Sequence, residues 1–317
     1  MLSEIASLSP RRQRRGSTLP GALSVAGAAL LWSTLGIFYR YLSREGGMSP
    51  LSIAFARAAG GGIVLAAFLV LRRPRDLIVA AADLPGFALG GFASVTLFYF
   101  FYIEAVRRTP IAVAVVLLYT APAWIALFSW VFWGESLSRL RAAALLLAAA
   151  GTALVAGLFS MQERQLDPVG IFFGFAAGLT YALYSIYGAW ASGRYETGTV
   201  VVYAMLFGAL FLLPWQSPGS LAPVFHSPSV LLCLAALVAG PTIGAYALYT
   251  RGLARAGASS ASLIATLEPL FAAILAAVLL HEIPPPQQAL GGVLILLALL
   301  LLGRRHDPKG SGIVRLN

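Results

Sequence analysis

The feature that most constrains this chain is a series of ten apolar runs, each about as long as a membrane is thick. The runs cover residues 20–42, 50–71, 84–105, 111–133, 141–160, 168–191, 198–214, 229–250, 258–281 and 286–303. A helix of about 20 apolar residues crosses the hydrocarbon core of a bilayer. The runs are continuously apolar rather than alternating, which favours helices over the strands of a membrane barrel. We therefore predict an all-α integral membrane protein with ten transmembrane helices.

The composition agrees with this prediction, because 59% of the residues are hydrophobic and only 11% are charged. Soluble domains carry about a quarter charged residues. The net charge of +10 comes from basic clusters between the apolar runs, as at 11–15, 72–75 and 304–305. Such clusters are typical of cytoplasmic anchors beside anionic headgroups. We expect the lipid bilayer, and no nucleic acid, as a partner.

The distribution of Lys and Arg between the loops predicts the orientation. With the N-terminus inside, sixteen basic residues fall in inner segments and five in outer loops, and Arg57 lies within a run. Inner loops of membrane proteins carry the excess of Lys and Arg. We predict that both termini are cytoplasmic, with tails at 1–19 and 304–317, and that the protein lies in the cell inner (plasma) membrane.

The second half of the chain repeats the first half with an offset of 147 residues. AVAVVLLYTAPAWIALFSWVFWGE corresponds to SSASLIATLEPLFAAILAAVLLHE, so that Pro122 matches Pro269 and Glu135 matches Glu282. The same offset pairs Tyr99 with Tyr246, Tyr102 with Tyr249 and Arg108 with Arg255. We predict two repeats, 20–160 and 168–303, of five helices each. Because five is odd, the second repeat enters the membrane from the opposite side, and such inverted repeats place the substrate site in a cavity between them.

The proline-centred segments and the AVRRTPIAVAV stretch resemble the paired EamA repeats of the drug/metabolite transporter superfamily. The resemblance covers nearly all of the chain after its first twenty residues. It implies ten helices, cytoplasmic termini, a central cavity and export of small metabolites. Within the superfamily, the chain is most similar to the YddG-type aromatic amino-acid exporters.

Two charged residues within the apolar runs are candidate substrate ligands. Glu268 lies at mid-membrane depth, where a carboxylate is costly unless it faces a cavity or is protonated. It is interpreted as a contact for a substrate ammonium or a proton-coupling group, or else as a protonated acid bonded to a neighbouring helix. Arg57 is interpreted as a ligand of a substrate carboxylate, with snorkelling to the outer interface or pairing with Glu104 as alternatives.

The other candidates are prolines and aromatic residues. Pro122 and Pro269 each remove a backbone hydrogen bond within a predicted span. They are interpreted as matched hinges that help the pathway open and close, against the alternative of ordinary helix bending. The aromatic candidates for the cavity are Trp32, Tyr99, Tyr102, Tyr119, Tyr181, Tyr184, Tyr246 and Tyr249. Interfacial belts and lipid-facing packing are the alternative for such side chains. The stripe of Gly170, Gly174 and Gly178 predicts close helix packing.

The sequence holds little material for an enzyme. His226, His281 and His306 are scattered, Cys233 is the single cysteine, and no GxxxxGK phosphate loop occurs. We expect no metal, no cofactor and no catalytic residues. The prediction is a secondary transporter, a monomer or weak dimer, that exports aromatic or hydrophobic amino acids or related small metabolites by alternating access. The alternatives are an exporter of other metabolites or cationic drugs, and a membrane scaffold without transport activity.

Overall fold

Helices account for all the regular secondary structure in the part of the chain that the structure describes. The computed structural model covers residues 1–317 and describes 18–133, 138–158, 167–217, 219–280 and 285–303. The helical elements are α2 (Thr18–Ser33), α3 (Leu35–Arg44), α4 (Pro50–Arg72), η1 (Pro74–Leu77), η2 (Ala81–Asp83), α5 (Leu84–Gly91), η3 (Phe92–Thr96), α6 (Leu97–Arg108), α7 (Ile111–Leu118), α8 (Ala121–Trp133), α9 (Arg139–Val155), α10 (Pro168–Ser192), α11 (Thr197–Leu212), η5 (Leu213–Trp215), α12 (Ala222–His226), α13 (Pro228–Leu237), η6 (Val238–Gly244), α14 (Ala245–Ala256), α15 (Ala258–Ala265), α16 (Leu267–Leu280) and α17 (Pro286–Gly303). Glu135, Glu282 and residues 1–17 and 304–317 of the predicted tails lie outside the described residues.

Seven helical stretches among the described residues are long and apolar enough to cross a membrane. They are Leu19–Arg44, Pro50–Arg72, Ala81–Arg108, Pro168–Ser192, Thr197–Trp215, Pro228–Ala256 and Ala258–Leu275. The other three predicted spans correspond to shorter described helices, namely the α7 and α8 pair, α9 and α17. The chain is therefore an all-helical, multi-pass membrane protein, whereas ten crossings remain a prediction.

Polar caps and prolines fix where the long helices begin. Ser49 precedes α4 and Asp167 precedes α10, and each side chain accepts a hydrogen bond from a backbone N–H of the first turn. Pro50 and Pro168 occupy the first helical positions, where a missing N–H costs nothing because that group has no intrahelical partner.

The two repeat-related prolines lie at interruptions of their helices, as predicted. The α-helix stops after Leu118 and resumes at Ala121, one residue before Pro122. The second interruption separates α15 from α16 at Thr266, and Pro269 is the third residue of α16. A proline can give no N–H to the preceding turn, so the regular hydrogen-bond ladder is broken there.

Two π-helical turns, η3 and η6, were not predicted from the sequence. They occupy equivalent places under the 147-residue offset, since η3 covers Phe92–Thr96 and η6 covers Val238–Gly244. Their packing partners are also equivalent. A Cβ added to Gly61 of α4 would lie 3.0 Å from Thr242 Cγ2 of η6. A Cβ added to Gly208 of α11, the residue matched to Gly61, would overlap Val95 of η3, the residue matched to Thr242.

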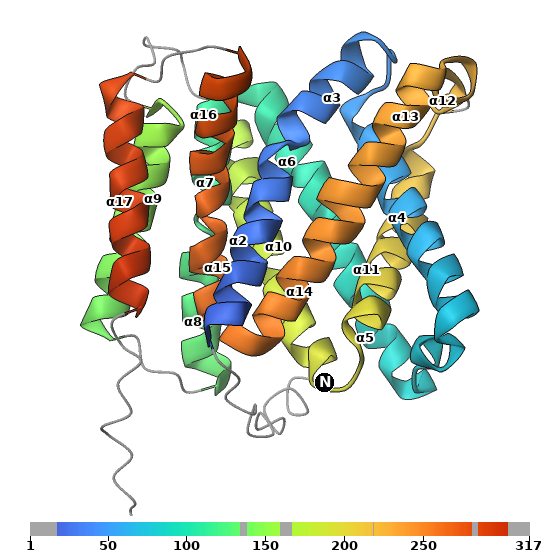
Figure 1. The fold of residues 1–317 in the computed structure, drawn as a ribbon, viewed down its shortest axis with the longest axis horizontal. Coiled ribbons are helices and arrows are strands. Elements are labelled where there is room, and N and C mark those ends of the chain that lie inside the picture. Colours follow the sequence, from blue (N-terminus) through green and yellow to red (C-terminus); the bar gives the residue numbers. More distant parts are fainter. Residues whose placement is uncertain (1–17, 134–137, 159–166, 218, 281–284, 304–317) are drawn as a thin grey trace, which may run out of the picture.

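The helices run roughly side by side across the molecule (Figure 1), and four pairs pack most extensively. These pairs are α9 with α17, α2 with α14, α6 with α10, and α4 with α11. The predicted glycine stripe faces neighbouring helices: a Cβ at Gly170, Gly174 or Gly178 would lie 2.5 Å from a side-chain atom of Thr109, Leu117 or Thr120. The stripe therefore brings α10 into close contact with α7, as expected for small residues in membrane helices.

Candidate functional site

Arg57 of α4 is buried in the interior of the helix bundle, with 3% of its surface exposed. Its Nε donates a hydrogen bond to Thr242 Oγ1 at 3.2 Å, and its Nη2 donates to the Pro241 carbonyl at 3.4 Å. Both acceptors belong to the π-helical turn η6, and the Tyr39 hydroxyl is a further neighbour. Burial excludes snorkelling to the interface, which was one alternative for this residue.

The other alternative, pairing of Arg57 with Glu104, is not found, because Glu104 has different partners. Glu104 lies near the end of α6 and forms ion pairs with Arg107 at 2.7 Å and with Arg108 at 3.2 Å. These partners are three and four residues further along the same helix, the spacing at which side chains meet on a helix surface. Arg108 also lies 3.7 Å from Asp167 at the start of α10.

The Arg57 guanidinium also borders two tyrosines that the repeat relates to each other. It lies 5.2 Å from the ring centroid of Tyr99, which is a cation–π distance. The Tyr99 hydroxyl in turn lies 3.4 Å from the Tyr246 hydroxyl. Tyr246 is the residue matched to Tyr99 under the 147-residue offset, so the two halves of the chain meet at this contact.

The aromatic candidates come together around Trp32 of α2. The ring centroid of Trp32 lies 5.2 Å from Tyr249, 5.5 Å from Tyr246 and 6.3 Å from Tyr181. Tyr184 lies 5.2 Å from Tyr246. Phe98 links Tyr181, at 5.8 Å, to Tyr102, at 6.0 Å. Rings from α2, α6, α10 and α14 thus form one connected cluster, called the aromatic cluster below.

Glu268 lies in the first turn of α16, one residue before Pro269. Its electrostatic neighbours are Tyr119, Arg57, Tyr102 and Tyr181. The residue is partly exposed even though side chains from several elements surround it. The Glu268 carboxylate thus neighbours Tyr102 and Tyr181 of the aromatic cluster, and the Arg57 guanidinium lies over Tyr99 of the same cluster.

Several tyrosine hydroxyls of the aromatic cluster are bonded to small polar residues that the sequence did not single out. Tyr184 pairs with Thr250 at 2.9 Å, and Tyr249 pairs with Ser185 at 2.7 Å. Thr242, Thr250 and Ser185 were missed because serine and threonine in apolar spans usually bond their own helix. The GPTIG segment around Thr242 carried a usable signal, since Pro241 interrupts a predicted span.

Comparison with known proteins assigns the chain to a family. The sequence profile of the EamA-like transporter family matches it twice, over residues 19–157 and 168–304. The chain belongs to this family. It is therefore a membrane transporter and not an enzyme.

The relatives of this EamA-like transporter span several bacterial and archaeal groups. It is 29% identical over 277 residues to an uncharacterized inner membrane transporter of Salmonella typhimurium, YicL, across 84% of this chain and 89% of the relative. An uncharacterized transporter of Archaeoglobus fulgidus is 26% identical over 264 residues, across 83% of this chain and 90% of the relative. A protein of known crystal structure shares the fold with a TM-score of 0.73 and 23% identity, over 90% of this chain and 98% of that one.

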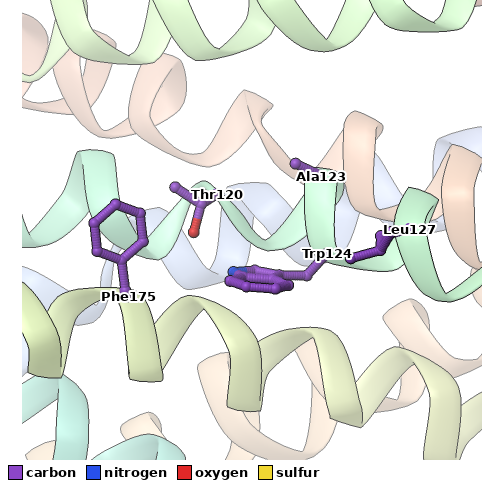
Figure 2. Close-up of a pocket in the computed structure, with 5 residues that line it drawn as sticks. All are labelled: Thr120, Ala123, Trp124, Leu127 and Phe175. Atoms are coloured by element: carbon purple, nitrogen blue, oxygen red, sulfur yellow. The ribbon is translucent and has the colours of Figure 1, made fainter.

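A groove on the outside of this EamA-like transporter lies beside α8 and α10, and Trp124 in its lining packs in one hydrophobic cluster with Tyr181. It has a volume of about 310 Å³ and is lined by Thr120, Ala123, Trp124, Leu127 and Phe175 (Figure 2). Leu127 and Phe175 are each 43% exposed, so the groove opens at the surface of the bundle. Its apolar lining suits lipid chains, and it holds neither of the two buried charge carriers.

Side chains of η2 and of the segment that follows α10 bind each other on the side predicted to be cytoplasmic. Arg194 forms an ion pair with Asp83 at 2.7 Å, and the Tyr195 hydroxyl donates to the other carboxylate oxygen at 2.7 Å. Bonding to the carboxylate raises the pKa of Tyr195, because it favours the neutral phenol.

Proposed function

We propose that this protein exports aromatic or hydrophobic amino acids, or closely related small metabolites, across the inner membrane by alternating access. The observation that carries the proposal is the pair formed by Arg57 and Glu268, which lie beside one aromatic cluster without forming an ion pair with each other. An amino acid carries a carboxylate and an ammonium, and these match the guanidinium and the carboxylate of the protein.

The energetic argument concerns charge inside a membrane. A charged side chain at bilayer depth costs several kcal/mol unless it is paired or serves function. Under the repeat offset Arg57 corresponds to Ala204 and Glu268 corresponds to Ala121, so packing within the repeats requires neither charge. Each charge belongs to one repeat alone, which supports binding of a polar substrate with two unlike ends.

The internal symmetry supports an alternating-access mechanism. The family profile matches each half separately, the repeat-related Tyr99 and Tyr246 meet, and the Gly61–Thr242 contact has the equivalent Gly208–Val95. Two inverted five-helix repeats that rock about a midplane site would account for these features. Pro122 and Pro269, at matched interruptions, are proposed as the hinges.

Counterflow in proteoliposomes tests the function. Vesicles that contain the purified protein are loaded with unlabelled amino acid, and uptake of labelled Phe, Met or Thr is followed against protein-free vesicles. Accelerated uptake of Phe and Met supports the proposal. Absence of counterflow for every amino acid, with protein shown to be folded, overturns it. Uptake of cationic drugs instead would favour the second candidate function, which needs Glu268 but not Arg57.

A further inference from the structure

Two tyrosine hydroxyls beside Glu268 are buried without a hydrogen-bond partner. They belong to Tyr119, at the interruption between α7 and α8, and to Tyr181 of α10. Tyr119 is only 8% exposed. Both are electrostatic neighbours of Glu268: the Tyr119 hydroxyl interacts with the carboxylate outside normal hydrogen-bond geometry, and the Tyr181 hydroxyl has no hydrogen bond with it. Buried polar groups are nearly always bonded, so each unpartnered one requires an explanation.

The contrast with the remaining tyrosines is informative. The hydroxyls of Tyr184 and Tyr249 bond Thr250 and Ser185, and the Tyr187 hydroxyl donates to the Val200 carbonyl at 3.0 Å. Those hydroxyls are satisfied within the protein. The unsatisfied hydroxyls of Tyr119 and Tyr181 both neighbour the Glu268 carboxylate, which fits a partner that comes from outside the chain.

The chemistry of the three groups indicates what that partner is. A carboxylate and two phenol oxygens offer acceptors from three separate elements, and a primary ammonium has three N–H donors. A quaternary ammonium has none, and each N-methyl group removes one. We propose that Glu268, Tyr119 and Tyr181 form a seat for a primary ammonium, so that the transporter selects primary amines over their N-methylated forms. The inference rests on the proposed function only in taking this ammonium to be that of an amino acid.

Removing one hydroxyl at a time separates this specificity role from a structural one. The test variants are Tyr119→Phe and Tyr181→Phe, and the matched control is Tyr187→Phe, whose hydroxyl is already bonded. In unliganded protein, Tyr119→Phe and Tyr181→Phe should leave the Tm unchanged or raise it, because no hydrogen bond of normal geometry is lost. Tyr187→Phe should lower the Tm, because a buried carbonyl loses its donor. A fall of the Tm in Tyr119→Phe and Tyr181→Phe as large as in Tyr187→Phe overturns the inference.

Binding is tested with simple amines rather than with the transported substrate. Purified protein is titrated with 2-phenylethylamine and with its N,N,N-trimethyl form, and the rise of the Tm is measured. We expect the primary amine to stabilise the wild-type protein and the trimethyl form to have little effect. The apparent Kd of the primary amine should rise about tenfold in Tyr119→Phe and in Tyr181→Phe, as for loss of one hydrogen bond to a charged group. The proposed ammonium seat is overturned if both amines raise the Tm equally, or if neither variant changes the Kd of the primary amine.

The amine titration tests the ammonium seat and amino-acid counterflow tests the transport function, so one claim can be wrong while the other holds. If no amino acid is transported but the primary amine still stabilises the protein selectively, the amino-acid function is wrong and the ammonium seat stands. If amino acids are transported with equal KM for Phe and N-methyl-Phe, the function stands and the seat is wrong.

Discussion

At the scale of single residues, the contacts of Arg57 depend on the shape of its guanidinium as well as on its charge. Its planar fork reaches Thr242 and the Pro241 carbonyl while its face covers the Tyr99 ring. Lysine keeps the charge but has neither the fork nor the planar face. We predict that Arg57→Lys lowers kcat/KM for counterflow at least tenfold, which is about 1.4 kcal/mol of lost stabilisation. Arg72→Lys, at the exposed end of α4, is the control and should transport normally.

Glu268 carries the second residue-scale prediction, which concerns pH. A glutamine has the same shape but can neither bind a proton nor carry charge. We predict that Glu268→Gln raises the substrate KM about tenfold and makes flux independent of an imposed pH gradient. Flux is measured in proteoliposomes with and without the gradient, and Glu196→Gln, in an exposed loop position, serves as the control. A pH response equal to that of the wild type would remove the proton-coupling role of Glu268.

At the residue scale, the sequence singles out unusual residues but does not report their partners. Arg57 and Glu268 are recognisable because charge is rare within apolar runs. Glu104 was one alternative partner for Arg57, but its carboxylate pairs with Arg107 and Arg108, three and four residues further along α6. Thr242, the true partner, lies 185 residues away, and only the fold brings it there.

At the scale of elements, the π-helical turn η3 depends on a glycine of the neighbouring helix. A Cβ at Gly208 of α11 would overlap Val95, in the middle of η3. We predict that Gly208→Ala lowers the free energy of unfolding by about 1–3 kcal/mol, as for other overpacked sites. Gly36→Ala is the control, because nothing lies within 4 Å of a Cβ there and α3 has room for it. It should stabilise the helix by roughly 0.5–1 kcal/mol, and thermal unfolding in detergent measures both. Equal changes in the two variants would contradict the packing argument.

The elements were predictable to different degrees, for physical reasons. The helices followed from apolar length, and the interruptions at Pro122 and Pro269 followed from the missing N–H. The π-helical turn η3 contains no proline and differs from an α-helix by one shifted hydrogen bond. Its position depends on Gly208 and other residues of α11, more than 100 positions further along the chain, and sequence patterns over one span do not report such contacts.

At the scale of the whole molecule, the question is whether the two repeats are antiparallel in the membrane. In an inverted arrangement the loop between the first two spans lies outside, and the equivalent loop of the second repeat lies inside. Glu45 marks the first loop and Glu196 the second, and both are exposed. In Figure 1 the α3–α4 turn and the α10–α11 turn lie at opposite ends of the molecule.

The single cysteine of the chain makes this testable with an impermeant maleimide. In a Cys233→Ser background, Glu45→Cys should be labelled in intact cells, and Glu196→Cys should be labelled only after the membrane is permeabilised. The excess of basic residues on the inner side sets this orientation. Labelling of both positions from the same side would exclude the inverted repeat and with it the rocking mechanism. Labelling in the reverse order would keep the inverted repeat but place both termini outside, because the two loops would remain on opposite faces while the whole chain is turned over.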